Sequence, residues 1–272
     1  MTRLTSEIVI PLISELDRYD RELNKKTGKN LKQIAAESVG IDVAEIDDIA
    51  SSISAAVIPI TADGGVIDGF VDAVRAIISH MGFNAFVTKQ KDVSGLAEGV
   101  ERGAKIVLLA DDNRFIAVNL KECFVADNSE STGKGFVTAL KLMAEDLKER
   151  KVLVIGAGKV GLSAMSRLKE YKAAIAVYDI DISKAEKASE LFGTVILKDL
   201  NDVFRHYQLI IDASPAKGIL KKEHITPYTM IAACGLPLIL DTEALKLVKE
   251  RLVHDPLQIG VATMFFSALF CR

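Results

Sequence analysis

The sequence predicts an α/β protein of two domains, and three observations lead to that prediction. Apolar residues recur three and four positions apart through residues 4–53, as they do along amphipathic helices. Short β-rich runs then alternate with helical patterns, which is typical of α/β layers. A second alternation of the same kind begins near residue 150, and 272 residues are enough for two domains of common size.

The first domain is expected over residues 1–145. After the helical segment it continues with strand candidates at residues 56–60, 83–87 and 105–110, which read AVIPI, FNAFV and KIVLLA. Helical patterns separate these runs, so we expect a small parallel α/β layer after the helical start. The stretch TGKGFVTALKLMAEDLKER, residues 132–150, is expected to be a long helix that joins the two domains.

The second domain is expected over residues 146–272. Its strand candidates are the apolar runs KVLVIG, AAIAVYD, QLIIDAS and TMIAAC, with helices between them. Residues 259–270 then form a helix that is hydrophobic on nearly all sides. We expect this helix to pack back on the first domain, buried between domains, or to form a subunit interface in a homodimer.

Composition excludes several classes of partner. Lys and Arg total 34 against 37 Asp and Glu, a net charge of -3 without a basic face, so neither nucleic acid nor an anionic membrane is expected. Every apolar run falls short of the roughly 20 residues that span a bilayer. The charged N-terminus is typical of an amphipathic helix rather than a signal peptide. Cys123, Cys234 and Cys271 lack pair or metal spacing, which predicts a cytoplasmic protein without a metal site.

A glycine-rich turn indicates the chemistry of the second domain. Gly156, Gly158 and Gly161 stand in G-x-G-x-x-G register between an apolar strand and a helix. In a Rossmann-type dinucleotide-binding domain, the first glycine permits the tight turn, the second lets the backbone approach the pyrophosphate, and the third lets helix and strand pack closely. Free amides at the helix start, which includes Lys159 and Val160, then meet the negative charge. The alternative is a tight turn without a ligand.

The residues after the next strand favour NAD as the dinucleotide. Asp179 lies 18 residues beyond Gly161, where a carboxylate binds the two hydroxyls of the adenosine ribose, and Ile180 follows it. The carboxylates of Asp179 and Asp181 would repel a 2′-phosphate, and no Arg follows them directly in the sequence to bind one. The sequence therefore predicts NAD rather than NADP.

Two later strand ends are expected to line the nicotinamide side of the nucleotide. They carry Ser214-Pro215 and Gly235. In a doubly wound sheet, ligands bind outside the carboxyl ends of the strands. A helix-starting turn explains Ser214-Pro215 equally well.

Five blocks of sequence resemble one enzyme family. They are IPITADGGVIDGF, KDVSG, ERGAKIVLLADDNRFIAVNLK, IGAGKVG and DPLQIGVATM. Together they are similar to the pyrrolysine synthase (PylD) family, which acts last in pyrrolysine biosynthesis. The similarity runs in order from about residue 56 to about residue 265 and is densest over residues 93–121, whereas residues 183–250 diverge.

The resemblance implies an oxidoreductase of amino-acid biosynthesis that uses NAD. Its substrate would be L-lysine-Nε-3R-methyl-D-ornithine, whose terminal primary amine loses hydride to NAD. The product would be an imine or, after water adds and ammonia departs, an aldehyde. The ornithyl α-amine then condenses on that carbon and closes a pyrroline ring.

The resemblance also implies which residues meet the substrate, and it makes the first domain the substrate-binding one. Such a substrate carries as many as three ammonium groups, so its pocket should supply acceptors and anions. Asp111 is expected to hold an amine and is the first choice for the catalytic proton acceptor, with an ordered water as the alternative. Asp255 stands where the family has Glu, which keeps the charge and shortens its reach. The substrate-binding set implied by the family is Leu4, Thr61, Phe70, Ala110, Asp111, Asn113, Asn128 and Asp255.

Other interpretations stay open at this point. Asp111, Asp112 and Asn113 are also ordinary turn formers, and we expect Asp112 to be structural. His254, beside Asp255, is the one histidine worth testing as an acid or base. The rival functions are a dehydrogenase resembling shikimate dehydrogenase, whose substrate-site lysine and N-V-T signature do not occur in this sequence, and a catalytically silent NAD-binding sensor.

Overall fold

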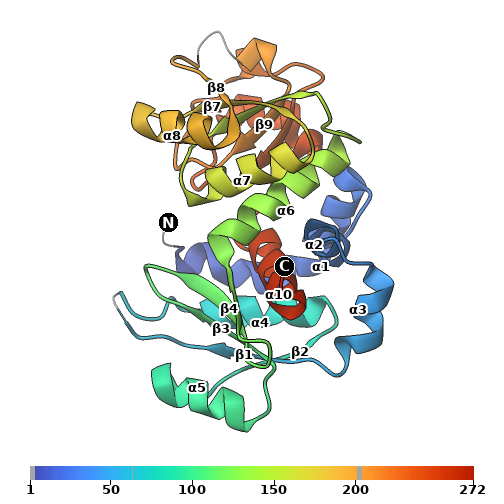
Figure 1. The fold of residues 1–272 in the computed structure, drawn as a ribbon, viewed down its shortest axis with the longest axis vertical. Helices are drawn as coiled ribbons and strands as arrows, with labels where there is room; N and C mark the ends of the chain where they lie inside the picture. Colours follow the sequence, from blue (N-terminus) through green and yellow to red (C-terminus); the bar gives the residue numbers. More distant parts are fainter. Residues whose placement is uncertain (1–3, 63, 201–203) are drawn as a thin grey trace. The chain divides into compact units, whose positions relative to one another are not determined.

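The computed structural model describes residues 4–62, 64–200 and 204–272. Contacts divide the chain into two compact units. The first comprises the chain up to Glu22, Asn30–Ser131 and Pro256–Arg272, and the second comprises Leu23–Lys29 and Thr132–Asp255. Each contains one β-sheet with helices against it (Figure 1). The predicted class, a helical start with a small α/β part and then a Rossmann-type part, is confirmed.

The units divide at a different point from the predicted boundary at residue 145. The division falls between Ser131 and Thr132, inside the single helix α6 (Asn128–Met143). An uninterrupted helix offers no Gly- or Pro-rich linker, so composition gives no sign of this boundary. The segment Pro256–Arg272, which the sequence analysis assigned to the second domain, belongs to the first unit.

The sheet of the first unit has five strands in the order β2-β1-β3-β4-β5. β1 pairs in parallel with β2 and β3, whereas β3–β4 and β4–β5 are antiparallel. The three predicted strands are parallel, as expected. Strands β4 and β5, which short hairpin turns add without a crossover helix, were not predicted from the sequence. The strands are β1 (Ser54–Ile58), β2 (Asn84–Val87), β3 (Ile106–Ala110), β4 (Phe115–Asn119) and β5 (Phe124–Asp127).

Helices cover both faces of this sheet. Alternate residues of β1 point to opposite faces, and Ala56 and Ile58 meet α5, where Gly95 and Gly99 allow a close approach. α4 and α10 lie on the other face (Figure 1). The helices of the first unit are α1 (Ser6–Thr27), which extends into the second unit, α2 (Leu31–Val39), α3 (Val43–Ala50), α4 (Phe70–His80), α5 (Asp92–Glu101) and α10 (Gln258–Phe270).

Helix α10 forms the centre of the first unit's core. Its residues from Gln258 to Ala268 are buried, and it packs against α2, α4 and strands β3 to β5. Phe83 meets Phe265 and Phe266 edge-on, with ring centroids 4.8 and 5.6 Å apart. The apolar surface of α10 is thus buried within the first unit. In the described part of the chain, no helix is both long and apolar enough to cross a membrane.

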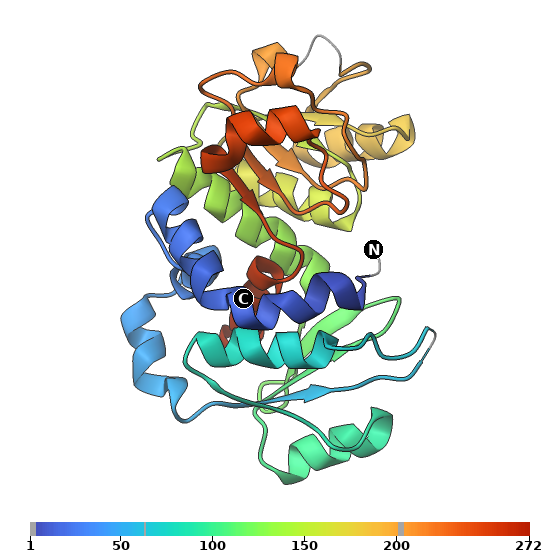
Figure 2. The same ribbon diagram turned by 180° about the vertical axis from the view of Figure 1, so that it is seen from behind.

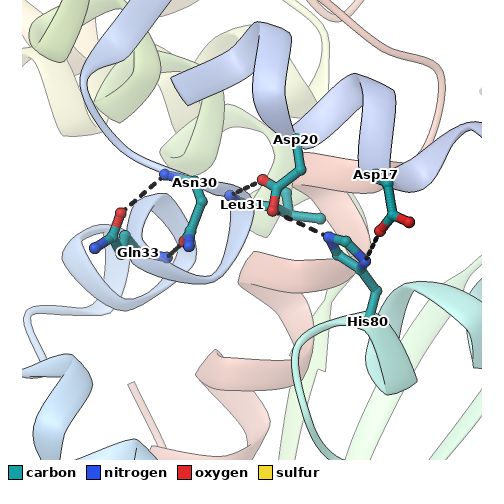
Figure 3. Close-up of polar contacts among 6 residues, drawn as sticks. All are labelled: Asp17, Asp20, Asn30, Leu31, Gln33 and His80. Carbon is teal, nitrogen blue, oxygen red and sulfur yellow. Dashed lines mark hydrogen bonds and ion pairs between the residues drawn. The ribbon is translucent and has the colours of Figure 1, made fainter. Parts of the chain in front are cut away.

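A polar cluster fastens the helical start to this core. His80, at the end of α4, lies with Nε2 3.0 Å from an oxygen of Asp20 and Nδ1 3.4 Å from Asp17 (Figure 3). The other oxygen of Asp20 accepts the N–H of Leu31 at 2.6 Å, so one carboxylate joins α1, α2 and α4. Asn30 and Gln33 cap the start of α2 reciprocally. Figure 2 shows α1 running alongside α4. His80 therefore has a structural role.

The second unit contains a six-stranded, parallel sheet in the order β11-β10-β9-β6-β7-β8. Chain order reverses between β6 and β9, which is the switch point where doubly wound sheets bind ligands. The strands are β6 (Lys151–Ile155), β7 (Ala174–Tyr178), β8 (Val195–Ile196), β9 (Leu209–Asp212), β10 (Met230–Ala233) and β11 (Leu252–His254). The helices are α6, α7 (Lys159–Glu170), α8 (Ile182–Phe192) and α9 (Thr242–Val248), with 3-10 turns at Phe204–His206, Lys222–His224 and Lys249–Arg251.

Candidate active site

The glycine loop follows β6, and its three glycines meet three different constraints. Gly156 has φ +95°, and a Cβ there would lie 2.6 Å from the carbonyl oxygen of Ala213. A Cβ at Gly161 would overlap the carbonyl oxygen of Gly156, so helix and strand pack too closely for a side chain. A Cβ at Gly158 would meet nothing within 4 Å among the described residues. The space in front of Gly158 is what a bound pyrophosphate requires.

The start of α7 offers hydrogen-bond donors to that space. Gly158 is the N-cap, and within the described residues no side chain caps the helix. Lys159, Val160 and Gly161 form the first turn, whose N–H groups have no partner inside a helix. These amides and the helix dipole favour an anion. The loop therefore fits the pyrophosphate of a dinucleotide.

Asp179 follows β7 and supports the same loop. Its Oδ2 accepts the N–H of Ala157 at 2.7 Å and its Oδ1 accepts the N–H of Asp181 at 2.8 Å. Asp181 caps α8, and a hydrogen bond from the Ser183 hydroxyl is the main cause that lowers the pKa of the Asp181 carboxyl. Ile180 is 93% exposed beside them, which leaves an apolar side chain free to cover an adenine ring. Two carboxylates thus lie directly after β7, and that of Asp179 contacts the glycine loop.

A second group of residues follows β9 and β10. The Ser214 hydroxyl donates to Oδ1 of Asp212 at 2.7 Å, and the Asp212 carbonyl accepts the N–H groups of Cys234 and Gly235 at 2.9 and 3.1 Å. A Cβ at Gly235 would overlap the Ser214 carbonyl oxygen. Pro215 is exposed next to Ser214. Sequence reasoning missed Asp212, whose only signal was a carboxylate ending an otherwise apolar strand.

In the first unit, most of the predicted substrate residues gather at one edge of the sheet. β1 and β3 run in parallel and end together, with Ile58 opposite Leu109. β4 starts and β5 ends at the same edge, because both neighbouring pairs are antiparallel. The residues brought to this edge are Thr61, Phe70, Ala110, Asp111, Asn113 and Asn128.

Hydrogen bonds and a ring contact hold the segment after β1 in place. The N–H and hydroxyl of Thr61 donate to Asp92 at 2.7 and 2.5 Å, and these bonds, the hydroxyl's first, lower the pKa of the Asp92 carboxyl. The N–H of Gly64 donates to Asp112 at 3.1 Å, which gives Asp112 the structural role expected of it. Phe70 lies edge-on to Phe115 with centroids 5.3 Å apart. Asp92 was missed because an Asp at the start of a helix is common and does not by itself indicate a site.

Asp111 is an exposed carboxylate that also closes its own turn. Its Oδ1 accepts the N–H of Arg114 at 2.7 Å and that of Asn113 at 2.8 Å, and these two bonds lower the pKa of the Asp111 carboxyl. A carboxylate with a lowered pKa holds a cation well and accepts a proton poorly. The geometry thus favours binding of an ammonium group by Asp111 and weakens its expected role as the base.

Asn128 is the first residue of α6, and Leu4 lies near the start of the chain. The Oδ1 of Asn128 is buried and has no hydrogen-bond partner within the described residues. A buried acceptor left unpaired costs about 1–3 kcal/mol, so a donor from a ligand would be stabilised there. Leu4 lies just ahead of α1, and a Cβ at Gly69 would be 2.7 Å from Ile10, which brings the first turns of α1 beside the start of α4.

Asp255 lies in the second unit, unlike the other predicted substrate residues. It follows β11 and is 3% exposed. His254 before it has Nδ1 2.8 Å from the carbonyl oxygen of Ala233, so one ring nitrogen is committed to the backbone. Across the described ranges, no group of three or more His, Cys, Asp or Glu side chains is arranged to hold a metal ion.

Comparison with curated proteins shows the family. The chain is 30% identical to pyrrolysine synthase of Methanosarcina barkeri over 270 residues, which cover 99% of this chain and 98% of that protein. It is 31% identical to pyrrolysine synthase of Methanosarcina acetivorans over 99% of this chain and 100% of that protein. The chain belongs to the pyrrolysine synthase family. The family profile described as "Pyrrolysine biosynthesis protein PylD, N-terminal domain" matches residues 10–126, and "Shikimate / quinate 5-dehydrogenase" matches residues 138–242.

Solved structures show the same fold outside this family. Shikimate dehydrogenase from Aquifex aeolicus superposes with a TM-score of 0.54 at 17% identity, covering 79% of this chain and 91% of that one. Shikimate 5-dehydrogenase from Thermus thermophilus, in complex with NADP(H) and shikimate, gives 0.53 at 18%, and quinate dehydrogenase from Corynebacterium glutamicum, in complex with NAD, gives 0.51 at 12%. Each of these two covers 81% of this chain and 94% of its own. This enzyme family therefore has a dehydrogenase-type fold.

Proposed function

We propose that the protein is a pyrrolysine synthase that acts as an NAD-dependent amine dehydrogenase. Its substrate is L-lysine-Nε-3R-methyl-D-ornithine, and its product is the pyrroline ring of L-pyrrolysine. The observation that carries the proposal is a complete G-x-G-x-x-G loop, open in front of Gly158, in a member of the pyrrolysine synthase family. We expect the enzyme to work in the cytoplasm, where NAD is supplied and its cysteines stay reduced. A homodimer stays a prediction.

The second unit supplies the cofactor site in this proposal. The glycine loop, with the first turn of α7, holds the pyrophosphate, while Asp179 takes the adenosine ribose and Ile180 covers the adenine. The loops at Ser214-Pro215 and Gly235 line the nicotinamide side. We favour NAD over NADP because Asp179 and Asp181 place two carboxylates where a 2′-phosphate would need a cation. When bound, NAD supplies the hydride acceptor, and the protein orients the reactants and excludes water.

The first unit supplies acceptors for a multiply cationic substrate. Asp111 holds an ammonium group, and the unpaired Oδ1 of Asn128 accepts a hydrogen bond from another. Asn113 donates or accepts as the geometry requires. Leu4, Thr61, Phe70 and Ala110 complete the walls. Asp255 stays a substrate contact that the family resemblance implies.

The reaction requires no reagent other than the substrate and NAD. The terminal CH2–NH3+ group loses a hydride to NAD and one proton, which leaves a protonated imine. The ornithyl α-amine attacks the imine carbon, the C–N bond to the original amine breaks, and ammonium departs as the ring C=N bond forms. The alternative path adds water first and passes through an aldehyde. Because the pKa of Asp111 is lowered, we assign removal of the proton to water, and Asp111 keeps the amine oriented.

The activity is tested by following the absorbance of reduced cofactor. Purified protein is mixed with NAD and either lysine-Nε-3-methylornithine or shikimate. We expect NADH to form with the first substrate alone. Turnover of shikimate would favour the rival dehydrogenase, and binding of NAD without turnover of any substrate would favour a sensor.

The cofactor site is tested by Gly158→Ala. The added methyl group has no protein neighbour within 4 Å, so the melting temperature should stay within about 2 °C of the wild type. The same methyl group would occupy the space of the pyrophosphate, so the NAD dissociation constant should rise at least about tenfold. Ser166→Ala, at an exposed position of the same helix, is the matched control and should change neither quantity. Unchanged NAD affinity in Gly158→Ala would refute the cofactor assignment.

The substrate site is tested by Asp111→Asn. The amide keeps an acceptor for the turn and loses the charge, so the turnover rate should fall at least about tenfold while NAD affinity stays the same. Asp48→Asn, at an exposed position without a proposed role, makes the same charge change and is the control. Full activity in Asp111→Asn would remove Asp111 from the mechanism.

A further inference from the structure

A carboxyl group lies fully buried at the end of the central strand β9. Asp212 is 0% exposed and stands between β6 and β10, at the switch point of the sheet. Burial of a carboxyl group is costly unless it is neutral or well paired. Its Oδ1 accepts the N–H and the hydroxyl of Ser214 at 3.1 and 2.7 Å. Oδ2 is buried and has no hydrogen-bond partner within the described residues.

Burial, rather than a neighbouring charge, governs the ionisation of Asp212. It raises the pKa of the Asp212 carboxyl to about 7, against the opposing hydrogen bonds from Ser214 and from the backbone of Ile239. The group facing it from β10 is the Cys234 thiol, 3.1 Å from the Asp212 carbonyl oxygen, whose own pKa is raised chiefly by burial and then by Asp212. Next to β10 lies β11, which ends at His254 and is followed by Asp255. On the other side of β9 lies β6, and Lys159 is the first charged residue of the helix that follows β6, α7. Asp212 is thus able to exchange a proton near neutral pH.

Asp212 is built into the loops proposed to receive the nicotinamide ring. Its side chain holds Ser214, and its carbonyl holds Cys234 and Gly235. The next residue, Ala213, approaches the glycine loop so closely that Gly156 has no room for a Cβ. A change of charge at Asp212 therefore changes the electrostatic environment of the site proposed for the nicotinamide ring. The oxidised nicotinamide ring carries a positive charge and the reduced ring carries none.

We propose that Asp212 sets the preference of this site between oxidised and reduced nicotinamide. The ionised carboxylate favours the cationic, oxidised ring, and the neutral acid favours the uncharged, reduced ring. Exchange of bound NAD for bound NADH is then accompanied by net uptake of protons from solvent by Asp212, about half a proton near pH 7. This inference rests on the proposed function, because it requires that the second unit binds the dinucleotide.

The test measures dissociation constants for NAD and NADH separately, from about pH 5.5 to about pH 8.5. In the wild type, the ratio of the NADH constant to the NAD constant should rise about tenfold across pH 7, the effect expected of one buried charge near the ring. In Asp212→Asn, which mimics the neutral acid, the ratio should stay constant. Asp48→Asn is the control and should follow the wild type.

Calorimetry of the wild type gives an independent measure that needs no variant. Titrations near pH 7 in buffers of different ionisation enthalpy report the protons taken up, and NADH binding should take up more protons than NAD binding. A ratio that is independent of pH in the wild type, equal proton uptake for the two nucleotides, or the wild-type slope in a folded Asp212→Asn would each overturn the inference while leaving the proposed function intact. Failure of the wild type to bind either nucleotide would overturn both.

Discussion

The buried carboxyl of Asp212 predicts an unusual effect on stability: Asp212→Asn should stabilise the protein in mild alkali. The pKa of this carboxyl is about 7 in the folded state, against 3.8 for an unperturbed group. The folded state therefore binds more protons than the unfolded state between those two values. The associated stability is fully present below about pH 4 and is lost as the pH rises through about 7.

The size of the effect follows from the shift. At about 1.36 kcal/mol for each pKa unit, a rise from 3.8 to about 7 costs the ionised wild type about 4 kcal/mol above pH 7. Asparagine does not ionise, but its NH2 group takes the place of the unpaired Oδ2 and costs about 1–2 kcal/mol without an acceptor. The variant should therefore gain about 2–3 kcal/mol over the wild type near pH 8 and lose stability relative to it near pH 4.

Urea unfolding at several pH values measures this difference. The pH dependence of the wild type alone is not informative. The pKa values of Asp92, Asp111 and Asp181 are lowered in the folded state, so the stability that these carboxylates contribute is lost as the pH falls, which is the opposite direction. The difference between wild type and variant cancels those groups. If the two stabilities differ by the same amount at every pH, Asp212 titrates normally and the argument from its burial is wrong.

Three further outcomes follow from the packing and the hydrogen bonds. Gly161→Ala should lose about 3 kcal/mol or more of unfolding free energy, because its Cβ would overlap a carbonyl oxygen of the loop, and a stable variant would show that helix and strand are less tightly packed. Asp179→Ala should raise the NAD dissociation constant at least about tenfold and raise the affinity for NADP relative to NAD, whereas unchanged affinities would show that the ribose assignment is wrong. Asp20→Ala should cost about 2 kcal/mol, because the Nε2 of His80 and the N–H of Leu31 lose their partner. Asp17→Ala, whose side chain is 82% exposed, should cost less than about 0.5 kcal/mol, and equal losses would contradict this account of the cluster.

The sequence identified those parts of the fold that depend on local pattern. Gly156, Gly158 and Gly161 could be assigned because each meets a separate steric condition within six residues of chain. The antiparallel strand β4 was missed, because the polar turn at residues 111–114, which joins β3 to β4, resembles the end of a parallel strand as much as the start of an antiparallel one. The direction in which a strand pairs depends on partners far along the chain.

The site was predictable where residue type alone carries the chemistry. Asp111 and Asn128 could be proposed as acceptors from the family resemblance. The bond from Asp92 to Thr61 and the burial of Asp212 could not, since each depends on how separate segments meet in space. The lowered pKa of the Asp111 carboxyl could not be predicted either, because it depends on how two backbone N–H groups of its own turn are oriented.

The position of α10 has a consequence for how the chain is made. During synthesis, Pro256–Arg272 leaves the ribosome only after the whole second unit has been translated. Until then, α2, α4 and β4 lack the helix that covers their apolar faces, and Phe83 lacks both of its aromatic neighbours. The second unit can form from nearly continuous sequence, whereas the first must wait with exposed hydrophobic surface, a state that is prone to aggregation. A nascent chain stalled before residue 256 should therefore be the form of this protein that chaperones retain longest.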